Sequence, residues 1–306
     1  MELRDLYYFE IIAEFEHVGR AAQYLHRSQP ALTSCLRRLE EAAGGPLIQK
    51  KGRGIQLTPA GRVLYDWARR MRLNVRDATL ELRDVVQGVT GEVRMGFVAS
   101  AAQFIFPRIT RTVLEEMPDV QLKTVVGLHE DLTHMLRQGE LDFMVVGESY
   151  KEPGFFSRAI LEDSIVPVAI ATHPVFQIAR PGLKTLCEYD WILQPPSIWP
   201  RQWLDQAFDR AGLPRPRARI EINMLNLQPE LIAESRLLGF LPRLQLMPGG
   251  RLREVKCPRA TMTRRLELRY REGAYLSPVA ARVIELLTHA GKLMSRRAKK
   301  GENKEP

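Results

Sequence analysis

Polar and basic side chains share one side of the segment that runs from residue 29 to residue 38. Short donors and acceptors stand at its start and arginines at its end, and the face comprises Gln29, Pro30, Thr33, Ser34, Arg37 and Arg38. Short polar side chains can hydrogen-bond to base edges when a helix lies in a major groove, and arginines can reach phosphates or guanine. The alternative interpretation is an ordinary solvent-facing stripe.

The other side of this segment predicts the helix that would carry the face. Its apolar residues follow an i, i+3, i+4, i+7 spacing, at Leu32, Cys35, Leu36 and Leu39. Ser28 is placed to cap the first turn, and Pro30 falls within that turn, where its missing N–H is tolerated. Two amphipathic helices that join near residues 16–18 precede it. The pattern favours a helix-turn-helix with residues 29–42 as the recognition helix.

A basic hairpin is predicted directly after this helix. Residues 44–58 contain two short strand patterns around a Lys51-Gly52-Arg53-Gly54 tip. Lys50, Lys51 and Arg53 would project from it toward the DNA backbone or a minor groove. A recognition helix beside such a wing favours DNA binding over a merely solvated face.

Residues 59–87 predict one long helix that begins at a Thr58 cap. It has no Gly or Pro after Gly61, and at 1.5 Å per residue it spans roughly 40 Å. Apolar and small residues alternate steps of four and three along it, and the predicted dimerisation residues are Leu64, Trp67, Met71, Asn74 and Ala78. Asn74 would fix the register of a dimer. The alternative is a helix packed on its own chain's core.

The second half of the chain alternates short apolar strand patterns with helix patterns. This alternation of strands and helices predicts a parallel α/β sheet with right-handed crossovers. Strand patterns recur in two blocks, and crossings near residues 161 and 263 would divide the region into two lobes with a ligand-binding cleft between them. A poorly patterned run at 248–265 precedes the last strand and the last helix.

Polar residues in the loops of this region are candidates for binding a small ligand. They are Ser100, His129, Glu130, Ser197, Trp199, Arg201 and Asn223. The arginine, serine and asparagine of this set suit a small carboxylate, whereas Trp199 and Trp203 equally suit an aromatic ring. Each has a structural alternative: Ser100 as a helix cap, Trp199 as a core residue, and Arg201 as the partner of a nearby acid.

Composition narrows the class of protein. The formal net charge of +9, with its excess at the two ends of the chain, favours a polyanionic partner. The three cysteines have no disulfide or zinc spacing, and Cys187 and Cys257 would form a redox pair only if the fold joined them. Catalytic and cofactor motifs are absent, so we expect no enzyme, metal or cofactor. No signal peptide or transmembrane segment is recognisable, which predicts a cytoplasmic protein.

Residues 1–65 resemble the DNA-binding region of LysR-type transcriptional regulators. The matching positions are Leu6, Phe9, Ala21, Ala22, Leu25, Ser28, Gln29, Pro30, Ala31, Leu39, Glu40, Gly45, Leu47, Arg53 and Leu57-Thr58-Pro59-Ala60-Gly61. Matches to the effector domain are Gly139-Glu140-Leu141-Asp142, His173-Pro174, Trp191-Ile192 and Gly239-Phe240-Leu241-Pro242. The chain departs from the family pattern at Glu16-His17-Val18-Gly19, where Gly-Ser-Phe-Thr is common, at Thr33-Ser34, and at Ile48-Gln49-Lys50. These departures bear on the operator sequence and on backbone contacts.

The resemblance implies a multi-domain protein. Its expected parts are a winged helix-turn-helix (1–58), a linker and dimerisation helix (59–88), an effector domain like the periplasmic binding proteins (89–296) and a basic, disordered tail (297–306). Lobe I would hold residues 89–161 and 264–296, and lobe II residues 162–263.

The function implied by the resemblance is transcription regulation. A homotetramer would bind an inverted-repeat operator in double-stranded DNA and respond to a small-molecule inducer, an organic acid or aromatic metabolite. RNA polymerase is a further candidate partner, and a membrane is not. The competing hypotheses are an architectural DNA-binding protein without ligand response and an enzyme that uses the helix-turn-helix for docking.

Overall fold

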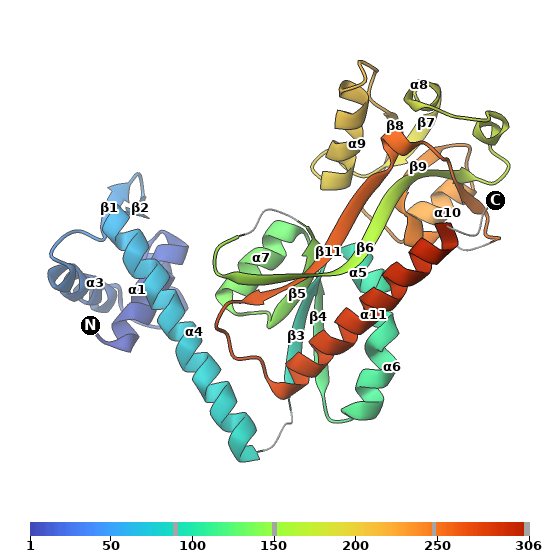
Figure 1. Ribbon diagram of the computed structural model, residues 1–306. Coiled ribbons are helices and arrows are strands. Elements are labelled where there is room, and N and C mark those ends of the chain that lie inside the picture. Colours follow the sequence, from blue (N-terminus) through green and yellow to red (C-terminus); the bar gives the residue numbers. More distant parts are fainter. Residues whose placement is uncertain (88–90, 149–151, 247–248, 303–306) are drawn as a thin grey trace. The chain divides into compact units, whose positions relative to one another are not determined.

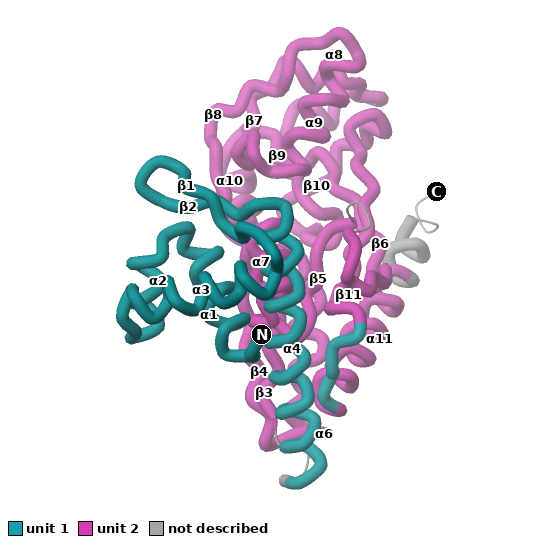
Figure 2. Tube along the Cα trace, turned by 90° about the vertical axis from the view of Figure 1, so that its left-hand side faces the viewer, with its two compact units in different colours: residues 1–90, 273–277 teal, residues 91–272, 278–306 magenta. Residues whose placement is uncertain are grey.

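The chain folds into two compact units. The computed structural model describes residues 1–87, 91–148, 152–246 and 249–302. Unit 1 comprises Met1–Thr90 and Gly273–Ser277, and unit 2 comprises Gly91–Glu272 and Pro278–Pro306 (Figure 2). The predicted end of the long helix at residues 88–90 lies outside the described residues.

Unit 1 contains the predicted helix-turn-helix, hairpin and long helix. Its elements are α1 (Leu3–Phe15), α2 (Val18–Tyr24), α3 (Gln29–Ala43), β1 (Ile48–Lys51), β2 (Gly54–Leu57) and α4 (Pro59–Gln87) (Figure 1). The Ser28 hydroxyl accepts a hydrogen bond from the Ala31 N–H at 3.4 Å, as the sequence predicts. Gly44 ends α3 with a φ of 71°, a conformation that glycine adopts without strain.

Helix α1 forms the centre of unit 1. Its Phe9 and Ile12 side chains are fully buried among apolar residues of α2, α3 and α4. The Glu10 carboxylate, also fully buried, accepts hydrogen bonds of 2.8 and 2.9 Å from the Arg72 guanidinium of α4. This pair attaches the long helix to the helix-turn-helix.

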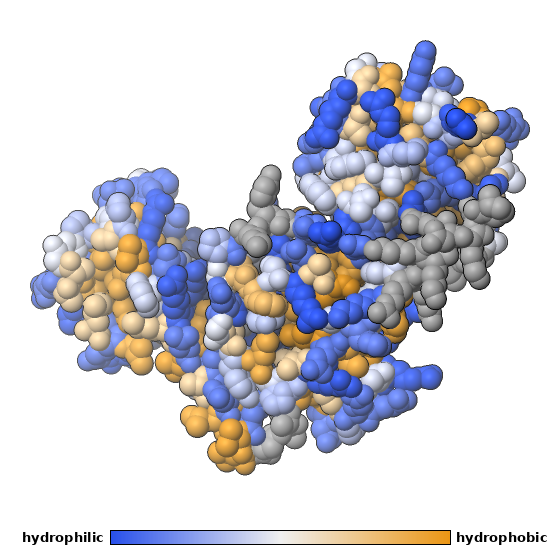
Figure 3. All heavy atoms as spheres, viewed as in Figure 1, coloured by the Kyte–Doolittle hydropathy of each residue, from blue (hydrophilic) through white to orange (hydrophobic). Residues whose placement is uncertain are grey.

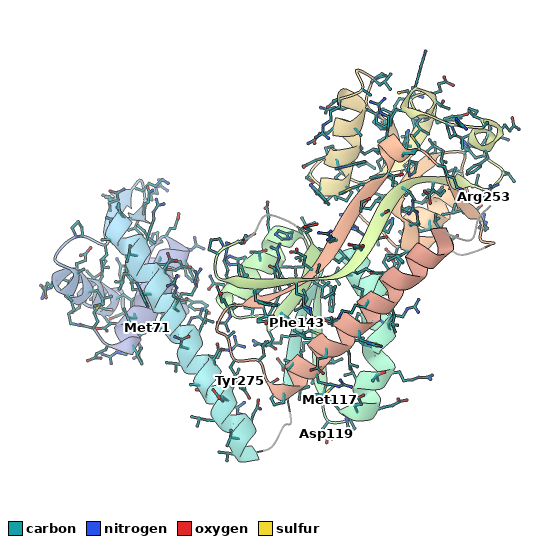
Figure 4. All side chains as sticks on the ribbon, viewed as in Figure 1. Met71, Met117, Asp119, Phe143, Arg253 and Tyr275 are labelled. Atoms are coloured by element: carbon teal, nitrogen blue, oxygen red, sulfur yellow. The ribbon has the colours of Figure 1, made fainter. Side chains whose placement is uncertain are left out.

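The start of α4 is fixed against the hairpin. The Thr58 hydroxyl accepts from the Gly61 N–H at 3.0 Å and donates to the Pro46 carbonyl at 2.8 Å. A Cβ at Gly61 would overlap the Leu47 carbonyl oxygen, so this close approach requires glycine. Farther along, the Tyr275 hydroxyl lies 3.0 Å from the Asp84 carboxylate, which attaches the 273–277 segment to α4 (Figure 4).

The described residues of unit 2 form one mixed sheet of nine strands. In sheet order the strands are β4 (Gln121–Val126), β3 (Glu92–Phe97), β5 (Phe143–Gly147), β11 (Met262–Arg271), β6 (Phe155–Ile170), β9 (Leu238–Pro242), β7 (Asp190–Leu193) and β8 (Arg217–Glu221), while β10 (Leu252–Glu254) pairs with β6. The outer pairs are parallel, as predicted. The prediction of a wholly parallel sheet is wrong, because β6 pairs antiparallel with β11, β9 and β10, and β11 pairs antiparallel with β5.

Helices cover both faces of this sheet. Around β3 to β5, one face carries α5 (Ala99–Phe104), α6 (Phe106–Glu116) and α11 (Pro278–Glu302), and the other carries α7 (His129–Gln138) (Figure 1). The remaining helices are η1 (Pro174–Gln177), α8 (Leu183–Leu186), α9 (Trp199–Asp209), α10 (Gln228–Ala233), η2 (Arg243–Gln245) and η3 (Pro258–Ala260).

The poorly patterned run before the last strand contains regular structure, and the predicted tail needs correction. Residues 249–265 include β10, η3 and the beginning of β11; such short elements leave little periodic pattern in a sequence. Helix α11 continues to Glu302, so residues 297–302 are helical where the sequence predicted a disordered tail. Alanine, lysine and arginine are good helix formers, which favours this extension. Residues 303–306 lie outside the described residues.

Unit 2 has a separate hydrophobic core at each end of its sheet. One core includes Leu161 of β6 and Leu266 of β11, and the other includes Ile165 of β6 and Met262 of β11. On each of the two long strands, therefore, only three residues separate a side chain of one core from a side chain of the other. These strands are the covalent connection between the two cores.

Candidate nucleic-acid interface and effector region

The polar face predicted on α3 is exposed along its whole length. All six predicted contact residues are exposed: Gln29, Pro30, Thr33, Ser34, Arg37 and Arg38. The Thr33 hydroxyl donates to the Gln29 carbonyl at 3.0 Å, so in this rotamer its oxygen remains free only to accept. Thr33 is thereby suited to a base-edge amino group, as on adenine or cytosine.

The two arginines of α3 differ in what holds them. Arg38 donates to the Asp5 carboxylate of α1 at 2.8 Å and to the Ser34 hydroxyl at 3.4 Å, so it anchors α3 on α1. Burial is the largest single influence and opposes ionisation of Asp5, but the hydrogen bonds from Arg38 and Cys35 together with the nearby positive charges outweigh it, so the pKa of Asp5 is lowered. Arg37 pairs with Glu41 at 3.3 Å in an open position, an interaction that DNA would displace easily.

The predicted wing is a regular two-stranded hairpin with exposed cations. Lys51 pairs with Gly54 in the ladder, and Gly52 at the tip has a φ of 60°. Lys50, Lys51 and Arg53 are exposed, and within the described residues no carboxylate holds any of them. Their charges are therefore available to phosphates.

Helix α4 buries one side and exposes an apolar seam on the other. Ala68 and Leu73 are buried in unit 1, whereas Trp67 is 53% exposed and Met71 37% exposed (Figure 4). Asn74 and Ala78 of the predicted seam are also exposed, and Leu64 is half-buried. Helix α4 therefore packs on its own chain's core, as the alternative interpretation predicts, and also exposes the predicted seam; pairing of two copies through that seam stays a prediction.

The seam continues into two further apolar features. Trp67 and Met71 line an apolar groove of about 640 Å³ that also includes Leu3 and Val63. At the other end of α4, an exposed cluster of Leu82, Val85 and Val86 forms an apolar tip (Figure 3). Large exposed apolar surfaces of this kind mark interaction sites.

The predicted ligand residues before β6 lie at the starts of two helices. Ser100 is the second residue of α5 and is buried. His129 begins α7, with its Nε2 at 3.5 Å from the Glu152 carboxylate. Glu130 follows it and is exposed.

The remaining ligand candidates lie around α9 and after β8. Ser197 and Asn223 are exposed in loops, and Trp199 is 48% exposed at the first position of α9, so it is not a core residue. Arg201 is buried and donates to both oxygens of Asp205 at 2.8 and 3.0 Å. Its alternative role, pairing with a nearby acid, is therefore present, and a ligand carboxylate would compete with Asp205.

A contact that the sequence does not reveal joins the two ends of unit 2. The Gln245 side chain of η2 donates to the Gln103 amide oxygen of α5 at 3.0 Å and to the Leu225 carbonyl at 3.4 Å. Leu244 packs against the core of β3 and β5. Glutamines carry no positional signal in a sequence, so only the structure identifies this bridge.

Comparison with known proteins identifies the family. The model described as "Bacterial regulatory helix-turn-helix protein, lysR family" matches residues 3–62, and the model described as "LysR substrate binding domain" matches residues 87–292. The chain belongs to the LysR family. It is a DNA-binding transcriptional regulator with an effector-binding domain, as the sequence resemblance implied.

Relatives named as HTH-type transcriptional regulators match most of the chain. The regulator GbpR of Azospirillum brasilense is 30% identical over 239 residues, which cover 77% of this chain and 70% of GbpR. BudR of Raoultella terrigena is 35% identical over 228 residues, covering 72% of this chain and 77% of BudR. The names of these relatives describe transcriptional regulators, not enzymes or architectural proteins.

Solved structures of LysR-type regulators share the fold. A full-length OxyR variant from Pseudomonas aeruginosa is 20% identical with a TM-score of 0.61, covering 96% of this chain and 95% of that chain. Full-length CbnR in complex with its target DNA is 21% identical with a TM-score of 0.52, covering 95% of this chain and 100% of that chain. In the described part of this LysR-family chain, no helix is long and apolar enough to span a membrane, and no group of acidic, histidine or cysteine side chains is placed to hold a metal ion.

The thiols of this regulator are expected to be unreactive at neutral pH. All three cysteines are free, and burial raises the pKa of Cys35 to about 12 and also raises the pKa of Cys187 and Cys257. A thiolate is the reactive form, so a raised pKa leaves less of it at any pH below that value. We expect an aromatic disulfide reagent to label the native protein slowly at about pH 7.5 and faster as the pH rises. Fast labelling of one thiol at neutral pH would argue for the redox role.

Proposed function

We propose that two copies of the chain pair through α4 and bind an inverted-repeat operator, with α3 of each copy in a major groove. The observation that carries this proposal is the exposed polar face of α3 beside three exposed wing cations, which no carboxylate among the described residues holds. A second-copy helix along the seam at Trp67 and Met71 would cover the exposed apolar surface of α4. Two half-sites related by the dimer axis would then lie one helical turn apart or a multiple of it.

The effector in this proposal is a small organic acid or an aromatic metabolite that binds unit 2 between its two cores. The half-exposed Trp199 and the exposed Ser197 and Asn223 support a site at this place, with Ser100, His129 and Glu130 on the opposite side. The Asp205 pairing of Arg201 favours the aromatic class over a strong anion. Binding regulates only if the ligand favours one arrangement over another, commonly by about 1–3 kcal/mol.

We further propose how the chain assembles, where it is located and which protein it contacts. The 89–161 plus 264–296 lobe and the 162–263 lobe would move relative to one another, and two dimers would form a tetramer on DNA. We place the protein in the cytoplasm, with RNA polymerase as a partner and without catalytic activity of its own. The architectural alternative has no support among the reported relatives.

Selection of DNA from a random-sequence pool tests this function. The purified protein is given the pool with excess competitor DNA at near-physiological salt, and the retained DNA is sequenced. We expect an inverted repeat whose half-sites are about one helical turn apart or a multiple of it. A retained pool without a common sequence would contradict base reading by α3.

Thr33 and Lys51 test the two kinds of DNA contact. Thr33→Ala should relax the preference at one base position by about 1 kcal/mol, because the single hydrogen bond that its oxygen accepts is removed. Lys51→Ala should weaken selected and random DNA alike and reduce the slope of log affinity against log salt by about 1. Titrations of both DNAs at several salt concentrations check this. Equal losses on both DNAs from both variants would contradict the two roles.

A further inference from the structure

The turn between α1 and α2 departs from the family pattern and has an unusual helix cap. Glu16 adopts a left-handed conformation with a φ of 48°. The next residue, His17, accepts hydrogen bonds through Nδ1 from the Gly19 N–H at 3.1 Å and the Arg20 N–H at 3.3 Å. The imidazole thus satisfies the N–H groups of the second and third residues of α2, a role that Ser, Thr, Asp or Asn usually fills.

This cap fixes the tautomer of the His17 ring. A nitrogen that accepts two N–H hydrogen bonds carries no hydrogen, so the neutral ring carries its hydrogen on Nε2. His17 is exposed, and within residues 1–87 the structure describes no acceptor for that Nε2–H. The ring therefore offers one oriented donor at the surface of the helix-turn-helix.

The donor lies beside the first residue of the recognition helix. A Cβ placed on Gly19 would be 3.1 Å from His17 Cε1 and 3.4 Å from the amide oxygen of Gln29. The imidazole and the Gln29 amide therefore both border the empty space at Gly19. A threonine there, as in the common family pattern, would crowd both groups, so His17 and Gly19 occur as a compatible pair.

We propose that His17 is a DNA-contacting residue whose Nε2–H donates to a phosphate oxygen next to the base pair contacted by Gln29. In a helix-turn-helix the first helix crosses the DNA backbone while the second enters the groove, which places the start of α2 at a phosphate. The N–H groups of Gly19 and Arg20 at the start of α2 are already occupied by Nδ1, and the ring adds its own Nε2–H as a donor there. The inference rests on the proposed placement of α3 in the major groove.

Two substitutions separate this contact from the cap. In His17→Asn the side-chain oxygen can replace Nδ1 as the cap, but no donor remains at the distance of Nε2. In His17→Gln the amide N–H₂ reaches farther along the side chain, but glutamine is a poor N-cap. His17→Asn should therefore be the more stable of the two variants, and His17→Gln should bind DNA more tightly.

We expect His17→Asn to melt close to the wild type and to bind DNA roughly tenfold more weakly, since a hydrogen bond to a charged oxygen is lost. The loss should be equal on selected and random DNA, with an unchanged salt slope, because a neutral donor releases no counterion. His17→Gln should melt lower than His17→Asn and yet bind more tightly than it. His134→Asn on α7 is the matched control and should alter neither property.

Affinity that follows stability across the two variants, or wild-type affinity in His17→Asn, would overturn the proposal. Nitrogen NMR that finds the hydrogen of the free protein's His17 on Nδ1 would overturn it as well. Gln29→Ala distinguishes this failure from that of the proposed function. If Gln29→Ala relaxes base preference while His17→Asn changes nothing, only the phosphate contact is wrong; if Gln29→Ala leaves base preference intact, the placement of α3 is wrong too.

Discussion

Replacing Trp67 and Met71 by glutamate should yield a folded monomer that has lost operator binding. Both side chains lie on the exposed seam of α4 and neither belongs to the buried core of unit 1, so the double variant leaves that core intact. Two carboxylates facing their counterparts across a helix pair would be desolvated without partners, which disfavours the dimer strongly. Loss of the second half-site should lower operator affinity by about 10²–10⁴-fold.

Sedimentation and DNA titration of the same samples would test this result. Arg83→Glu, which is exposed on α4 outside the seam, serves as the control for added negative charge and should leave the dimer intact. Helix content by circular dichroism should be unchanged in the double variant. A double variant that remains a dimer would show that copies pair through another surface.

The elements of unit 1 could be predicted because their signals are local. Ser28 and Thr58 cap the helices that they precede, and Gly44 and Gly61 stand where a positive φ or a close approach requires glycine. Apolar periodicity gave the buried side of α3. Such signals depend on neighbours within a few residues, which a single sequence displays completely.

Pairing over long distances in the chain could not be predicted. Arg38 looked free for DNA because its partner Asp5 is 33 residues away, whereas Asp205 stands four residues from Arg201 on one helix. Likewise, nothing in the 155–162 stretch announces that β6 begins there, because this strand is stabilised by its ladder with β11. Tertiary context decides such strands.

The reason for the departure from the family pattern at residues 16–19 could be found only in the structure. The sequence showed the departure from the family pattern at residues 16–19 but gave no reason for it. Only the distances around Gly19 show that the His17 ring, the missing Cβ and the Gln29 amide fit together. A departure from a family pattern becomes interpretable once the residues that compensate for it are located.

Asp163→Asn should be the most destabilising single change between the two cores of unit 2. The Arg264 guanidinium donates to the Asp163 carboxylate at 2.9 Å, and their side chains are only 8% and 1% exposed. Burial raises the pKa of Asp163, and Arg264 offsets this only in part. A guanidinium cannot lose its proton, so the variant retains an uncompensated buried cation, at a cost of about 3–5 kcal/mol. Urea unfolding measures this loss.

Arg264→Met should be milder and should make stability depend on pH, because an unpaired carboxyl can become neutral by binding a proton. The folded pKa of Asp163 would then lie still farther above its unfolded value of about 3.9. The folded state binds the proton more tightly, so stability is greatest below the unfolded pKa and is lost as the pH rises through the folded one. Unfolding at about pH 5 and about pH 8 should therefore differ more in Arg264→Met than in the wild type.

Arg265→Met is the control, since its pair with Glu162 is half exposed and should contribute less than about 1 kcal/mol. A loss in Asp163→Asn no larger than in this control would mean that water reaches the pair. Asp163 and Arg264 pair at the point where the two cores meet. Asp163 lies between Leu161 and Ile165 on β6, and Arg264 lies between Met262 and Leu266 on β11. Because the buried pair holds β6 and β11 together where the two cores meet, its loss should also weaken the coupling between effector binding in unit 2 and DNA affinity.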